Sequence, residues 1–158
     1  MFYISHQQAG LNLAAIAAGA LTAALIAQYV YGLAPCVLCI YQRIPYAVIV
    51  VLGLMAGFGP KRFVRFSLYL ISAALAVELA LAVFHVGVEQ KWWEGTSACK
   101  INLEGADAAA ILEQIRTAPR ALCTDIAWSL FGISMAGYNA LLSLGLFASI
   151  ALYLKRKK

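Results

Sequence analysis

The chain has 158 residues, of which 63% are hydrophobic and 12% charged. Soluble domains carry roughly a quarter charged residues, so this composition excludes an ordinary soluble protein and indicates a membrane protein. The net charge of +5 does not predict nucleic-acid binding. The basic residues gather at the ends of apolar segments and do not form a polar stripe interleaved with aromatic residues.

Four apolar segments dominate the chain. A membrane-spanning helix needs about 20 consecutive apolar residues, a requirement that segments 11–33, 37–58, 66–88 and 126–154 meet. Together they fill most of the chain, and lipid requires every backbone polar group to be bonded internally. We therefore expect an all-α membrane protein, a four-transmembrane-helix bundle that forms a single membrane domain over residues 1–158.

Charged residues predict how this bundle is oriented. Segment 59–66 and the tail 155–158 hold seven basic residues and no acidic one, whereas the loop 89–125 holds four basic and six acidic residues. The positive-inside rule then places both termini and segment 59–66 in the cytoplasm. The long loop between the third and fourth helices is predicted to lie in the periplasm of a bacterium, outside its inner membrane.

All four cysteines fall on the outer side in this topology: Cys36, Cys39, Cys99 and Cys123. Disulfides persist in the bacterial periplasm and not in the cytosol, which favours two disulfide-forming pairs. Cys36 and Cys39 form a CxxC motif near a predicted helix start, where the helix dipole favours a reactive thiolate. The other two have 23 residues between them, and a purely structural disulfide there could contribute about 3 kcal/mol.

A four-cysteine zinc site is the other possibility for these residues. Only Cys36 and Cys39 have the close spacing of a zinc half-site, and no histidine lies in either outer loop. We therefore predict no metal.

Arg43 follows Cys39 by one helical turn, as an unpaired cation at the edge of the bilayer. An intramembrane charge is a functional hypothesis by default. It could stabilise the Cys39 thiolate or donate a hydrogen bond to the carbonyl oxygen of a bound quinone. The alternative is that its side chain only extends to the aqueous interface.

Other features leave alternatives open. Pro45 either kinks the second helix or marks its start. Glu78 lies on one helical face with His85 and is either protonated and hydrogen-bonded within the bundle or part of a proton path. Segment 106–117 has a helical apolar pattern, typical of a helix on the membrane surface or of a solvated loop helix. The Gly53-xxx-Gly57 spacing indicates close helix packing inside the bundle.

The run Cys36-Val-Leu-Cys39-Ile-Tyr-Gln-Arg43, followed by a long outer loop with a second cysteine pair, resembles the bacterial disulfide bond formation protein B (DsbB) family. The resemblance covers essentially the whole chain. It implies a thiol:quinone oxidoreductase that reoxidises DsbA, a thioredoxin-like periplasmic protein.

The resemblance also implies a role for each site residue. DsbA would attack the Cys99–Cys123 disulfide, with Cys99 forming the mixed disulfide, and the electrons would then pass to Cys36 and Cys39. Cys39 would interact with ubiquinone or menaquinone beside Arg43. His85 matches a family histidine near the quinone, although by itself it would be assigned as an interfacial packing residue.

Two other functions compete with this one. A vitamin K epoxide reductase-like enzyme also uses a CxxC motif at a quinone, but its active motif normally lies late in the chain. A non-catalytic membrane scaffold would have only structural disulfides and would not need Arg43 beside the CxxC motif.

Overall fold

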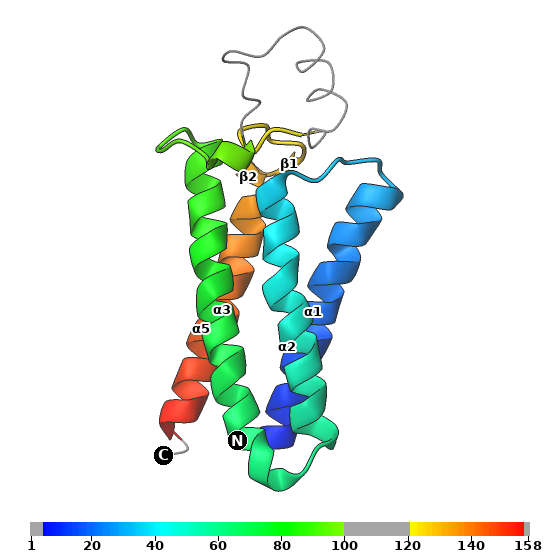
Figure 1. The fold of residues 1–158 in the computed structure, drawn as a ribbon, viewed down its shortest axis with the longest axis vertical. Coiled ribbons are helices and arrows are strands. Elements are labelled where there is room, and N and C mark those ends of the chain that lie inside the picture. The colour runs from blue at the N-terminus through cyan, green and yellow to red at the C-terminus, as the bar shows by residue number, and fades with distance from the viewer. Residues whose placement is uncertain (1–4, 100–120, 157–158) are drawn as a thin grey trace, which may run out of the picture.

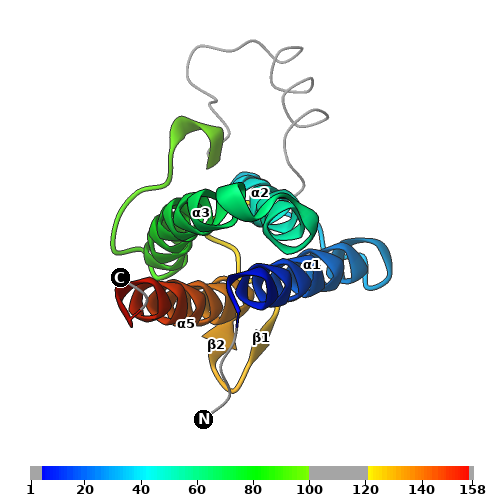
Figure 2. The same cartoon turned by 90° about the horizontal axis from the view of Figure 1, so that it is seen from below.

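The computed structural model describes residues 5–99 and 121–156. Its long helices are α1 (His6–Tyr29), α2 (Val37–Phe58), α3 (Lys61–Glu89) and α5 (Met135–Arg156), and each is long and apolar enough to cross a membrane (Figure 1). Viewed along the bundle, α2 and α3 lie on one side and α1 and α5 on the other (Figure 2). The prediction of a helical bundle with four membrane-spanning segments is confirmed.

The first and third helices start earlier than the sequence indicated. α1 begins at His6 and ends at Tyr29, against a prediction of 11–33, because Ser5 and Gln8 form a capping box at its N-terminus. α3 begins at Lys61 and not at 66, with Pro60 as its N-cap residue. Polar residues thus extend both helices beyond their apolar segments.

The fourth helix starts later than predicted. It begins at Met135, and most of the expected first turns, 126–134, contribute instead to a hairpin of β1 (Ser129–Leu130) and β2 (Ile133–Ser134). Phe131 and Gly132 both have positive φ angles, 50° and 77°, which a tight two-residue turn requires and a helix forbids. The Ser134 hydroxyl then accepts the Gly137 backbone N–H and caps the first turn of α5.

Two further expectations concern chain segments between these elements. Pro45 lies inside α2, so it does not mark the helix start. A 3₁₀ turn, Ser97–Cys99, follows α3. The predicted helix at 106–117 lies outside the described residues.

The helices pack tightly at the end where α1 begins. Gly10 and Gly53 bring α1 and α2 into close contact, which confirms the packing role of the small residues in α2. His6 on α1 and Tyr153 on α5 are joined by a hydrogen bond of 2.9 Å. The main core lies in this half and includes Leu13, Ala17, Ile49, Leu68, Leu75, Leu146 and Ile150.

At the opposite end α1 leans away from the bundle (Figure 1). A second, smaller buried cluster forms here from Cys36, Leu38, Val88, Cys99 and Cys123. The fold therefore has a densely packed end and an end where cysteines supply much of the core.

Substitution of Gly53 tests the close contact between α1 and α2. A Cβ atom there would lie 2.5 Å from the Gly10 carbonyl oxygen and 2.7 Å from Ala14 Cβ, so we expect Gly53→Ala to lower the free energy of unfolding by about 1–3 kcal/mol. Gly145→Ala is the matched control, because nothing lies within 4 Å of its Cβ position. Thermal unfolding in detergent would compare the two, and equal stabilities would contradict the packing described.

Candidate functional site

The CxxC motif lies at the start of α2. Cys36 is the N-cap residue, and its sulfur accepts a hydrogen bond of 3.1 Å from the Cys39 backbone N–H. The two sulfur atoms are 2.7 Å apart, and both cysteines are free thiols. The motif therefore lies where the first N–H groups of a helix favour negative charge.

The two thiols are not equivalent. Cys36 is buried, whereas Cys39 is only partly buried. Hydrogen bonding to Cys39 and burial raise the pKa of the Cys36 thiol. The Cys36 thiol therefore loses its proton less readily than an ordinary cysteine thiol.

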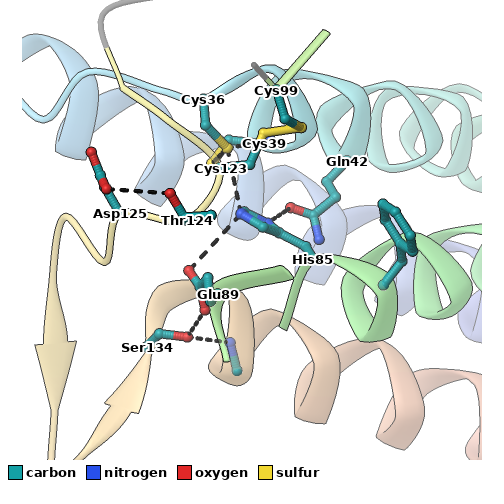
Figure 3. A network of polar contacts seen from close by, with 12 residues as sticks. Cys36, Cys39, Gln42, His85, Glu89, Cys99, Cys123, Thr124, Asp125 and Ser134 are labelled. Carbon is teal, nitrogen blue, oxygen red and sulfur yellow. Dashed lines mark hydrogen bonds and ion pairs between the residues drawn. A yellow bond between two sulfur atoms is a disulfide. The ribbon is translucent and has the colours of Figure 1, made fainter. Parts of the chain in front are cut away.

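His85, on α3, lies beside the sulfur pair (Figure 3). Its Nε2 atom is 3.4 Å from Cys36 Sγ, and its Nδ1 atom is 3.2 Å from Gln42 Oε1. A carbonyl oxygen can only accept a hydrogen bond, so Nδ1 carries the ring hydrogen and Nε2 presents its lone pair to the Cys36 thiol. The structure thus joins the predicted His85 to the CxxC motif itself.

Glu89 completes this polar chain one turn further along α3. Its Oε1 atom is 3.9 Å from His85 Nε2. The Oε2 atom accepts a hydrogen bond from the hydroxyl of Ser134, in the hairpin before α5. The carboxylate is thereby held beside the imidazole, as Figure 3 shows.

The second cysteine pair forms a disulfide between Cys99 and Cys123, with Cα atoms 5.4 Å apart. Both residues are buried and pack in the same cluster as Cys36. The structure therefore brings all four predicted cysteines to one end of the bundle, with the two pairs in contact through their shared cluster (Figure 3).

This geometry also bears on metal binding. Cys99 and Cys123 are joined to each other, so a four-cysteine zinc site is not formed. Cys36, Cys39 and His85 offer three ligand atoms within 4.8 Å of one another. His85 comes from a helix and not from an outer loop, so loop spacing does not reveal it as a ligand; the absence of a metal stays a prediction.

Arg43 has a hydrogen-bond partner that the sequence did not indicate. Its Nη1 atom donates to Gln28 Oε1, on α1, at 2.6 Å. The expectation of an unpaired cation is corrected in this respect, although the partner is neutral. The Arg43 Nε atom is buried and has no hydrogen-bond partner among the described residues.

A cavity of about 480 Å³ opens between α1 and α5 beside these groups. Its wall is largely apolar and includes Ala20, Leu21, Ala24, Ala27 and Leu142. Cys36, Cys39, Gln42, Arg43 and His85 form its polar end. Ligand pockets of this size, with few polar groups on an apolar wall, suit a small organic molecule.

Two donors at the polar end favour a ligand that carries oxygen acceptors. Among the described residues, Gln42 Nε2 and Arg43 Nε are buried without a hydrogen-bond partner. An unpaired buried donor costs about 1–3 kcal/mol, which a ligand oxygen would recover. The cavity is therefore suited to a largely apolar ligand that carries oxygen acceptors.

A second polar chain lies deeper between α2, α3 and α5. The Tyr46 hydroxyl donates to Asn139 Oδ1, and Asn139 Nδ2 donates to Glu78 Oε1, both at 2.7 Å. Glu78 is fully buried and hydrogen-bonded within the bundle, whereas its protonation and the alternative of a proton path stay predictions. Tyr46 and Asn139 line the cavity.

Sequence reasoning missed several of these polar residues. Glu89 could have been found, because it follows His85 by four residues and so shares its helical face. Gln42 precedes the predicted Arg43, but nothing in its spacing distinguishes it. Gln28 and Asn139 reach the site only because α1 and α5 pack where they do.

Comparison with known proteins shows similarity to membrane proteins of disulfide bond formation. The family model "Disulfide bond formation protein DsbB" matches residues 6–153. A Disulfide bond formation protein B of Shewanella loihica is 32% identical over 126 residues, covering 76% of this chain and 72% of that protein. One of Aromatoleum aromaticum is 31% identical over 170 residues, covering 99% and 96%.

An uncharacterized Rickettsia prowazekii protein, RP370, is 30% identical over 138 residues, covering 85% of this chain and 80% of that protein. No solved structure matches the chain. The four apolar spans and the family point to a multi-pass inner-membrane protein. The chain belongs to the disulfide bond formation protein DsbB family.

Proposed function

We propose that this protein is a membrane thiol:quinone oxidoreductase. It reoxidises a periplasmic thioredoxin-fold dithiol oxidase of the DsbA type and passes the electrons to ubiquinone or menaquinone. One observation carries the proposal: two cysteine pairs share a buried cluster, and the CxxC pair also lines an apolar cavity with unpartnered donors. A route for electrons from a soluble thiol to a lipid-soluble acceptor needs this arrangement.

The first step is thiol–disulfide exchange at the loop pair. A thiolate of the reduced partner attacks Cys99, the Cys99–Cys123 bond breaks, and Cys123 leaves as a thiolate. The second partner thiol then releases Cys99, so the partner leaves oxidised and the loop pair is reduced by two electrons.

The second step moves these electrons to the CxxC pair. A loop thiolate attacks the Cys36–Cys39 disulfide at Cys36, which packs against the loop pair, and Cys39 leaves as a thiolate. The loop disulfide then reforms.

A bound quinone would be the final acceptor of two electrons and two protons. Arg43 and Gln42 bind and orient it through their free N–H groups, while the Ala-rich face of α1 excludes water. Arg43 also favours the thiolate form of Cys39, one helical turn away.

The proposal includes the topology and the single membrane domain. Basic residues at 59–66 and 155–158 favour a cytoplasmic position for the end of the bundle opposite the cysteines. The cysteine end then faces the periplasm, where disulfides persist.

Family membership supports this enzyme over a vitamin K epoxide reductase-like one. A scaffold with structural disulfides would explain Cys99–Cys123. It gives no reason for a CxxC pair beside a cavity with two unpartnered donors among the described residues.

Replacement of each cysteine tests the relay. Purified protein given reduced DsbA-like partner should reduce a soluble quinone analogue, and Cys→Ala at 36, 39, 99 or 123 should each abolish steady-state turnover. Chemically reduced Cys99→Ala/Cys123→Ala protein is the control, since its intact CxxC pair should still reduce the quinone in a single turnover. Full steady-state activity in any single variant would refute the relay.

Arg43 and Gln28 test quinone binding. A hydrogen bond from a charged donor contributes about 1.5–3 kcal/mol, so Arg43→Ala should raise the KM for quinone about 10- to 100-fold, with a smaller change in kcat. Gln28→Leu should raise KM less, because it only frees the Arg43 side chain. Arg65→Ala, an exposed arginine at the other end of α3, is the matched control. An unchanged KM in Arg43→Ala would remove the assigned role.

A further inference from the structure

We propose that His85 is the general base that accepts the proton of Cys36, and that Gln42 is the positioning residue that fixes the His85 tautomer. The proposal deepens the function proposed above and rests on it. It assigns chemistry to Gln42 and to the side of His85 that faces sulfur.

The hydrogen-bond pattern around the imidazole supports this assignment. Gln42 Oε1 accepts from Nδ1, which leaves the lone pair of Nε2 directed at Cys36 Sγ, 3.4 Å away. A nucleophilic sulfur, a histidine base and an amide that orients the histidine recur in cysteine enzymes on unrelated folds. All three side chains here are buried, so water does not compete for these contacts.

Cys36 needs such a base. Its thiol is buried, and its pKa is raised. The S–S bond to Cys39 cannot form until the Cys36 S–H bond breaks. Nε2 of His85 is the nearest nitrogen base in the described site.

The proton balance of the step closes. Oxidation of two thiols to a disulfide releases two electrons and two protons, the number that a quinone takes up on becoming a hydroquinone. Cys39 leaves the preceding exchange as a thiolate and carries no proton, so the hydroquinone takes its other proton from bulk water, into which the incoming thiols have released theirs. The Cys36 proton moves to His85 Nε2 as the S–S bond forms, and His85, which lines the cavity, then returns it to a reduced quinone oxygen.

Glu89 stabilises the charged intermediate form of His85. Its carboxylate oxygen is 3.9 Å from Nε2 and is held by Ser134. The other titratable groups that share the cavity with His85 are Cys39, Arg43 and Tyr46 of α2, Asp125 before the hairpin, and Tyr138 of α5.

The test measures the reactivity of Cys36 without quinone. Full-length protein with Cys39→Ser, Cys99→Ala and Cys123→Ala retains one cysteine, whose alkylation by iodoacetamide is followed against pH. His85→Ala should shift this profile upward by about one pH unit, a tenfold slower reaction at fixed pH below the midpoint. His6→Ala, a histidine at the opposite end of the bundle, should leave it unchanged.

Gln42 variants separate positioning from packing. Gln42→Leu should reproduce much of the His85→Ala shift, because Nδ1–H loses its acceptor and the tautomer is no longer fixed. Gln42→Glu should restore the parental profile or move it lower, because a carboxylate also accepts from Nδ1–H. An unchanged profile in His85→Ala, or equal profiles for Gln42→Leu and Gln42→Glu, would overturn the proposal.

A further variant covers the case in which His85→Ala disturbs folding. His85→Gln keeps an amide in place of the ring but removes the base, so it should show the same shift as His85→Ala; a parental profile would overturn the proposal. If the shifts occur but the four-cysteine protein reduces no quinone, the proposed function fails while the base assignment stands. If quinone is reduced and no shift occurs, the base assignment alone fails.

Discussion

The position of one sulfur atom, Cys36 Sγ, organises the cysteine end of the bundle. It accepts the N–H of Cys39 at the first turn of α2, lies 2.7 Å from Cys39 Sγ and 3.4 Å from His85 Nε2, and packs on the loop disulfide. Because Cys36 is only 3% exposed, its chemistry depends on these neighbours and not on water. The start of α2, the end of α3 and the loop pair therefore act on the same atom.

One end of the bundle is tightly packed, and the other end holds the candidate site. Where α1 begins, glycine contacts and the His6–Tyr153 hydrogen bond hold the helices together. Towards the cysteines α1 leans outward, and the cavity that opens leaves buried donors on Gln42 and Arg43 unpaired. Buried donors without a partner cost free energy. Packing in the first half offsets the cost of these unpaired donors, which an oxygen-bearing ligand could then bind.

Much of this architecture follows from the sequence alone. Apolar length predicts the spanning helices, and the CxxC motif with Arg43 points to the end of the bundle that holds the candidate site, because lipid and sulfur chemistry each constrain composition strongly. The late start of α5 was missed because hydropathy does not reveal that Phe131 and Gly132 adopt positive φ angles. The partners Gln28, Gln42 and Ser134 could not be predicted, since their roles depend on how helices distant in sequence pack. Glu89 is the exception, as its spacing from His85 pointed to it.

Direct exchange between the two cysteine pairs is the central claim, and trapping it is the most direct measurement. Full-length protein with Cys39→Ala and Cys99→Ala retains only Cys36 and Cys123, which share one buried cluster. The account predicts that these two sulfurs form an intramolecular disulfide on mild oxidation, detected by mass spectrometry of non-reduced peptides. If both remain free thiols, or pair only between molecules, electrons do not pass from the loop to the CxxC motif in the way described.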